Sequence, residues 1–138
     1  MNADIKKNPV ALAGVFLEKD GRYLLVKEAG GRDQGLWMIP AGKIEFGEEP
    51  LKVAKRELKE ETGGEFQADA LLGIYSIRRM DREPLHPINP IMFVFKGKYT
   101  STGTQPVDPE IADAQWFTEA EIMKLPLRSP LAMQRMIE

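Results

Sequence analysis

The segment over residues 50–62 constrains the fold more than any other part of the chain, because it predicts an amphipathic helix with defined ends. Pro50 suits the first position of a helix, and Gly63 supplies the stop, since glycine readily adopts the left-handed conformation that ends helices. The apolar residues of this segment recur at helical spacing and form one stripe, with lysines roughly opposite: Leu51, Ala54 and Leu58. Such a stripe has to be buried against another layer of structure, so the rest of the chain must supply that layer.

The apolar segments around this helix predict strands. Residues 10–17 predict a buried strand, residues 19–21 a turn, and residues 23–26 the returning strand of a hairpin. Further strands are expected over residues 71–77, within 88–99 and over 115–117, and a last helix over 130–137. Thr118 and Glu121 have the spacing of a capping box that begins a short helix. This mixture predicts an α/β (α+β) fold with a mixed sheet, and residues 1–138 suit a single domain.

Composition narrows the class of function. The 19 basic and 21 acidic residues give a formal charge of −2, which argues against a protein that binds nucleic acid by bulk electrostatics. The chain has no Cys and one His, so a metal site within it must use carboxylates and backbone oxygens, which suit Mg²⁺ or Mn²⁺. The first apolar stretch, residues 10–17, is too short to span a membrane, and the N-terminus lacks the form of a signal peptide. We therefore expect a cytoplasmic protein without a membrane partner.

Three glutamates on the predicted helix form the first candidate site. Glu57, Glu60 and Glu61 have the spacing that places them on one face, within about 5–6 Å between Cβ atoms. Like charges so placed repel one another unless a cation neutralises them. Two interpretations follow from the spacing, a solvated acidic face and a metal site. The helix already has a solvated lysine face, and the glutamates flank the apolar stripe where the helix approaches the sheet, which favours the metal site.

Residues 42–64 resemble the Nudix box, G-x5-E-x7-R-E-U-x-E-E-x-G-U, in which U is apolar. Gly42, Glu48, the segment 56–61 and Gly63 match every fixed position. The exception is the last apolar position, where Gly64 stands and where we expect one packing contact behind the helix to be weakened. The segments 37–45 and 116–122 are also similar to the family, so the chain resembles the Nudix hydrolases over most of its length.

The resemblance implies a Nudix-type α/β/α sandwich with a central mixed sheet and a divalent-metal-dependent hydrolase. It implies that Glu57, Glu60 and Glu61 bind the metal and that Glu48 is an accessory acid near it. It also implies that Gly42 lets the backbone approach the metal or the phosphates. Arg56 would orient Glu57. Mg²⁺ is the expected cofactor, with Mn²⁺ also possible, because hard cations shield phosphate charge and lower the pKa of bound water.

Residues outside the box supply further candidates. The general base is expected to be Glu57 or Glu61, with Glu110, in an acidic turn before the strand at 115–117, as the outside candidate. A basic cluster suits phosphate binding, since the planar guanidinium matches phosphate oxygens: Arg78, Arg79 and Arg82. Arg128 is expected either to cap the substrate pocket or, with Ser129 as N-cap, to begin the last helix.

Several functions remain open at this point. The expected substrate is a small nucleoside diphosphate-linked molecule. Three short segments, residues 40–42, the acidic turn and residues 127–131, resemble the phosphatase-type enzymes that act on nucleoside tri- and diphosphates and on the pyrimidine pyrophosphate precursor of thiamine. The alternatives within the enzyme class are an ADP-ribose pyrophosphatase, a nucleoside triphosphate pyrophosphatase and a dinucleoside polyphosphate hydrolase. A non-catalytic nucleotide sensor is the alternative outside it. The sequence leaves open whether the protein is a monomer or a homodimer.

Overall fold

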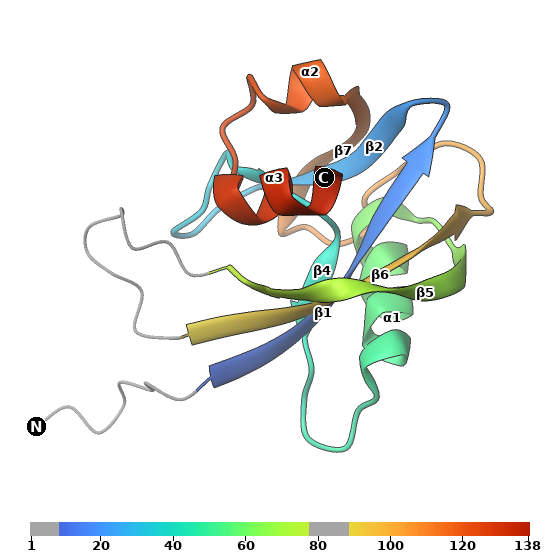
Figure 1. The fold of residues 1–138 in the computed structure, drawn as a ribbon, viewed down its shortest axis with the longest axis vertical. Helices are drawn as coiled ribbons and strands as arrows, with labels where there is room; N and C mark the ends of the chain where they lie inside the picture. The colour runs from blue at the N-terminus through green and yellow to red at the C-terminus, as the bar shows by residue number, and fades with distance from the viewer. Residues whose placement is uncertain (1–8, 78–88) are drawn as a thin grey trace, which may run out of the picture.

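The structure is a computed structural model that describes residues 9–77 and 89–138. In these ranges it contains seven strands and three helices, in the order β1, β2, β3, β4, α1, β5, β6, β7, α2, α3 (Figure 1). Their bounds are Pro9–Lys19, Arg22–Glu28, Trp37–Met38, Ala41–Lys43, Pro50–Thr62, Phe66–Ser76, Asn89–Tyr99, Ile111–Thr118, Glu119–Ile122 and Pro130–Ile137. None of these helices has the length and apolar character needed to cross a membrane.

The strands form one mixed sheet in which β1 is the central branching strand. It pairs in parallel with β6, and antiparallel with β2 and β4. β5 extends the sheet from β6, and β2 carries β3 and β7, all antiparallel. The predicted hairpin is confirmed, since Glu18 pairs with Tyr23 across a turn in which Asp20 and Gly21 have φ values of 53° and 76°.

Two hydrophobic clusters cover the two faces of this sheet. Successive side chains of a strand point to opposite faces, and β1 divides its buried residues accordingly. Ala13, Val15 and Leu17 pack in the cluster that contains the buried face of α1. Leu12 and Phe16 pack in the other cluster, with buried residues of α2 and α3. Figure 1 shows α1 apart from the two C-terminal helices, with the sheet between them. The predicted α/β/α sandwich is therefore confirmed.

The helix that carries the glutamates has the predicted bounds. Gly63 ends α1 with a φ of 74°, and its N–H donates to the carbonyl of Lys59 at 2.8 Å. Ala54 and Leu58 of the stripe are fully buried, together with Val53, while the lysines at 52, 55 and 59 are exposed. This packing on β1 fixes the rotation of α1 about its axis, and so decides which glutamates face the sheet.

The expectation for Gly64 is wrong. A Cβ at this position would fall on the ring and hydroxyl of Tyr99, the last residue of β6. The Tyr99 ring is buried there, packs edge-on against Trp116 at 5.2 Å between ring centroids, and its hydroxyl donates to the carbonyl of Gly103 at 2.6 Å. The packing contact is therefore made by an aromatic ring from the sheet, and a larger residue at 64 would displace it.

Ser129 occupies the N-cap position of α3, as expected, and only the capping bond from its side chain is missing. The helix α3 does begin at Pro130, but the side chain of Ser129 makes no capping bond. Its buried hydroxyl instead donates to the carbonyl of Ile77 at 2.9 Å, which ties the start of α3 to the end of β5. The sequence also missed the first five residues of β5 and the short strand β4.

Candidate active site

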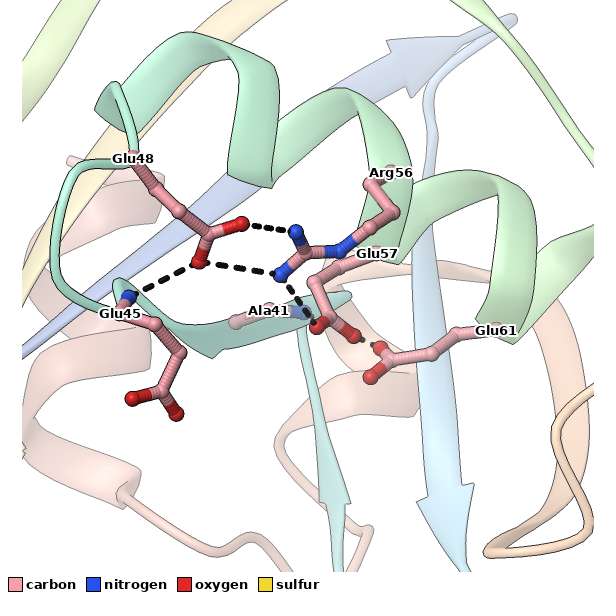
Figure 2. Close-up of polar contacts among 6 residues, drawn as sticks. All are labelled: Ala41, Glu45, Glu48, Arg56, Glu57 and Glu61. Carbon is pink, nitrogen blue, oxygen red and sulfur yellow. Dashed lines mark hydrogen bonds and ion pairs between the residues drawn. The ribbon is translucent and has the colours of Figure 1, made fainter.

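Two of the three glutamates of α1, Glu57 and Glu61, point at each other from successive turns of the helix. Glu61 is buried, with 7% of its surface exposed, and Glu57 has 15% of its side chain exposed (Figure 2). A hydrogen bond links the two carboxyl groups, and the N–H of Ala41 in β4 donates to Oε1 of Glu61 at 3.1 Å. The helix rotation that buries the apolar stripe therefore also directs this pair into the space between α1 and β4.

The surroundings of Glu57 and Glu61 disfavour the state in which both carboxyl groups are ionised. Burial raises the pKa of Glu61 well above its ordinary value, and the charge of Glu57 adds to this effect. Burial also raises the pKa of Glu57, with the neighbouring charge of Glu60 contributing. A proton between the two carboxyl groups would relieve their repulsion and supply the donor of a hydrogen bond, since an ionised carboxylate is only an acceptor. A cation at the same place can take over the neutralising role of that proton.

Gly42 allows the backbone of β4 to approach this pair closely. A Cβ at position 42 would fall on the terminal atoms of the Glu57 side chain, so only glycine leaves room for the carboxylate in its present position. The resemblance implied that Gly42 lets the backbone approach a metal or phosphates. In the structure the group that occupies this space is the Glu57 carboxylate, and direct contact of Gly42 with a ligand remains a prediction.

Arg56 lies beside Glu57, in agreement with the orienting role expected for it. Its Nη2 is 3.6 Å from Oε1 of Glu57, and the same guanidinium is hydrogen-bonded to the carboxylate of Glu48 (Figure 2). The bond from Arg56, with a second from the N–H of Glu45 at 2.9 Å, lowers the pKa of Glu48. Glu48 therefore fixes the arginine in place, and its expected role as a metal ligand stays a prediction.

The third box glutamate and the acidic turn meet at the other end of the site. The side chain of Glu60 is exposed, and its carbonyl accepts hydrogen bonds from the N–H groups of Val107 and Asp108 at 3.0 and 2.8 Å. Glu110 has an exposed side chain, and its carbonyl accepts a bond from the N–H of Ala29 at 2.8 Å. The turn that contains Glu110 is thus bonded to both α1 and β2, and the role of Glu110 as general base stays a prediction.

The expected substrate-binding arginines have different outcomes. Arg78 and Arg79, with Arg82 of the same cluster, lie outside the described residues. Arg128 is described and half-buried, and it contacts two acids: its Nε is 3.0 Å from Asp33 and its Nη1 is 3.9 Å from Glu28. Substrate contact by Arg128 therefore remains a prediction, while its contact with these acids is a finding.

Glu28 is a partly buried acid near Arg128 that the sequence analysis did not single out. It is the last residue of β2, and burial raises its pKa, an effect that Arg128 opposes and that neighbouring acids reinforce. Its charge also contributes to the raised pKa of Glu61. The available signal was the pair of charged residues, Lys27 and Glu28, that follows the buried run at 24–26 and marks the end of the strand.

The donor set fits a hard divalent cation in part. Over residues 9–77 and 89–138, no three acidic or histidine side chains converge closely enough to form a ready-made metal site. The converging donors are the pair Glu57 and Glu61, both oxygen ligands. Mg²⁺ is commonly held in this way, by one or two carboxylates with waters and substrate phosphates filling its remaining positions. The arrangement can therefore bind such an ion together with a phosphorylated substrate.

Comparison with known proteins identifies the family. The family model described as NUDIX domain matches residues 7–138. A MutT-like protein of Streptomyces ambofaciens is 33% identical over 113 residues, which cover 82% of this chain and 66% of the relative. Phosphatase NudJ of Shigella boydii is 30% identical over 128 residues, or 91% of this chain and 80% of the relative.

A NUDIX hydrolase structure from Nitrosomonas europaea has a TM-score of 0.79 and 32% identity, and the match covers 91% of this chain and 84% of that one. The chain thus spans slightly less than two thirds of the length of the Streptomyces relative. The chain belongs to the NUDIX domain family.

Proposed function

We propose that this protein hydrolyses a phosphoanhydride bond in a small nucleotide-like substrate, in a reaction that depends on Mg²⁺ or a similar divalent cation. The observation that carries the proposal is the pair Glu57 and Glu61, whose carboxyl groups face each other between α1 and β4 and are largely shielded from solvent. Keeping such a pair costs stability, which is understandable if a bound cation neutralises it in the working enzyme.

The residues of the pair would hold the cation, with Glu60 available on the same face of α1. When bound, the ion supplies charge neutralisation for the phosphates and lowers the pKa of a bound water. Arg56 and Glu48 keep Glu57 directed at this position. Because the Glu57 and Glu61 side chains are largely shielded from solvent, their charges act in a medium that screens them weakly. We take either of them, or Glu110 in the acidic turn, as the group that accepts the proton of the attacking water.

For the substrate, we propose the phosphatase-type reaction on nucleoside tri- or diphosphates. The support is the similarity to the relative named phosphatase NudJ, which extends over 91% of this chain. Pyrophosphatase action on ADP-ribose, nucleoside triphosphates or dinucleoside polyphosphates provides the alternative products, and a non-catalytic sensor would give no products at all.

The test is turnover of the purified protein with Mg²⁺ on a panel of nucleoside tri- and diphosphates, ADP-ribose, dinucleoside polyphosphates and phosphorylated pyrimidines, with every product identified. Glu57→Gln and Glu61→Gln should each lower kcat by about 10² to 10⁴-fold, the range expected for loss of a general base or a site electrostatic group. Glu65→Gln is the matched control, since its exposed carboxylate pairs with Lys59, at 3.7 Å. Full activity in either site variant, or turnover that persists in excess chelator, would overturn the proposal.

A further inference from the structure

The loop between β2 and β3, residues 29–36, is rich in glycine and is closed by hydrogen bonds at its base. The N–H of Gly35 donates to the carbonyl of Glu28 at 2.9 Å, and the N–H of Glu28 donates to the carbonyl of Leu36 at 3.0 Å. Gly31 and Gly35 have φ values of 77° and 81°, and a Cβ on either would meet nothing within 4 Å. The glycines therefore contribute no side-chain packing that would hold the loop against its neighbours.

Arg128 approaches this loop from a backbone that is itself fixed. Its N–H donates to the carbonyl of Trp37 at 2.9 Å, and the N–H of Trp37 donates to the carbonyl of Pro126 at 2.9 Å. The next residue, Ser129, is anchored just after β5 by its buried hydroxyl. Because these bonds place the segment 126–129 beside β3, the guanidinium of Arg128 extends toward the loop from a rigid support.

Two acids, one within the loop and one at its base, receive this guanidinium. The carboxylate of Asp33, in the loop, is 3.0 Å from Nε of Arg128. The carboxylate of Glu28, at the base, is 3.9 Å from Nη1 of the same arginine. The three side chains are between 17% and 30% exposed, so solvent screens their charges less than on an open surface. Arg128 therefore links the middle of the loop to its base.

Without the arginine, the acids around this loop would repel one another. Burial raises the pKa of Glu28, and Arg128 opposes this effect. The charges of Asp33 and of two acids in the turn at 108–110 raise the same pKa, which is the effect of like charges close by. The turn is also joined to the loop, since the N–H of Ala29 donates to one of its carbonyls at 2.8 Å. The ion pairs of Arg128 thus offset a repulsion that acts to open the loop.

We propose that Arg128 is an electrostatic latch that holds the glycine-rich loop 29–36 closed against the segment before α3. The latch has two contacts, one within the loop at Asp33 and one at its base at Glu28. When these contacts are broken, the loop opens locally while the sheet remains intact. The closed loop is bonded to the acidic turn, so the latch also restrains the turn that carries Glu110. The inference concerns loop closure and does not depend on the proposed hydrolase.

The experiment measures amide hydrogen exchange by NMR on the full chain, without substrate or metal. Four amides report on the loop, because their N–H groups are bonded within it or to the acidic turn: Ala29, Gln34, Gly35 and Leu36. Arg128→Met should accelerate their exchange by about 5- to 50-fold, a loss between those of exposed and buried ion pairs. The amides of residues 24–26, which pair with β7, should exchange at unchanged rates. Arg22→Met is the matched control, because its ion pair with Glu121, at 3.3 Å, lies at the opposite end of β2.

Further variants distinguish a latch from an arginine that only packs. Asp33→Asn removes the closer partner and should accelerate loop exchange about as much as Arg128→Met does. Glu28→Gln in the Arg128→Met background should slow loop exchange again by about three- to tenfold, because it removes the repulsion between the two acids. Arg128→Lys should recover only part of the protection, since a single ammonium group cannot contact two acids through separate nitrogens.

The outcomes that overturn the latch are equally specific. Unchanged loop exchange in Arg128→Met overturns it, and so does acceleration of the loop and of residues 24–26 by the same factor, which indicates general destabilisation. Loop exchange that stays as fast when Glu28→Gln is added to Arg128→Met overturns its electrostatic basis. If Arg128→Met does not fold, Asp33→Asn replaces it: accelerated loop exchange supports the latch and wild-type exchange overturns it. Because no readout uses turnover, failure of the hydrolase proposal leaves these results unchanged.

Discussion

Replacing Gly42 with alanine should disable the site without unfolding the protein. The φ of Gly42 is not positive, so alanine can adopt the same backbone conformation. The added Cβ, however, would meet Cγ, Cδ and Oε1 of Glu57 at distances that real side chains essentially never show. The strain is therefore local, and it falls on one catalytic candidate.

The size of the effect follows from the displacement. Carbon atoms in contact lie about 3.5–4.0 Å apart, so the Glu57 carboxylate must retreat by more than about 1 Å. A misplacement of about 1 Å in an active site can cost roughly 10²-fold in rate. We expect kcat to fall by about 10²-fold, which corresponds to about 2.7 kcal/mol of transition-state stabilisation.

The assay is steady-state hydrolysis of the best substrate with saturating Mg²⁺, accompanied by thermal unfolding. Gly30→Ala is the matched control, because a Cβ at Gly30 meets nothing within 4 Å and its φ is likewise not positive. In the Glu57→Gln background, Gly42→Ala should add little further loss, since the carboxylate is already absent. Wild-type kcat in Gly42→Ala, or an equal loss with and without Glu57, would refute the reasoning.

Three further predictions concern stability and orientation. Because the pKa of Glu61 is raised in the folded state, its contribution to stability is present below its ordinary pKa of 4.5 and is lost as the pH rises through the raised value. The metal-free protein should therefore become easier to unfold in urea as the pH rises from 4.5. A free energy of unfolding that does not change with pH would contradict this. Gly64→Ala should lower the free energy of unfolding by about 1–3 kcal/mol, because the new Cβ overlaps the Tyr99 ring; unchanged urea denaturation would count against it. Arg56→Met should lower kcat by about 10- to 100-fold, because Glu57 loses its orienting contact. The free energy of unfolding should fall by less than about 1 kcal/mol, since the ion pairs of Arg56 are partly exposed. An effect on stability alone would contradict the orienting role.

The parts of the site that depend on local spacing were predictable from the sequence. The bounds of α1 follow from Pro50 and Gly63, and the apolar stripe fixes which face meets the sheet. The same periodicity placed Glu57, Glu60 and Glu61 at the edge of that face, and the structure shows only the first and the last of these three shielded from solvent. Glu60, one position before Glu61, is rotated outward and exposed.

The parts that depend on contacts between distant segments were not predictable. Nothing near Gly64 in the sequence indicates that a tyrosine from β6 fills its place. In the same way, the approach of Arg128 to Glu28 depends on how the segment before α3 is bonded to β3. Strand pairing creates such contacts, and residue patterns within one element carry no information about them.

The central claim is that the buried pair Glu57 and Glu61 is a cation site, and the most direct test is the free energy of unfolding at pH 8 with and without Mg²⁺. Wild-type protein should gain stability with Mg²⁺, by about 2.7 kcal/mol when the ion is at 100 times its Kd. Glu61→Gln should be more stable than wild type without Mg²⁺, because it removes a buried charge, and should gain little when Mg²⁺ is added. An equal Mg²⁺ response in both proteins, or none in either, would contradict the claim.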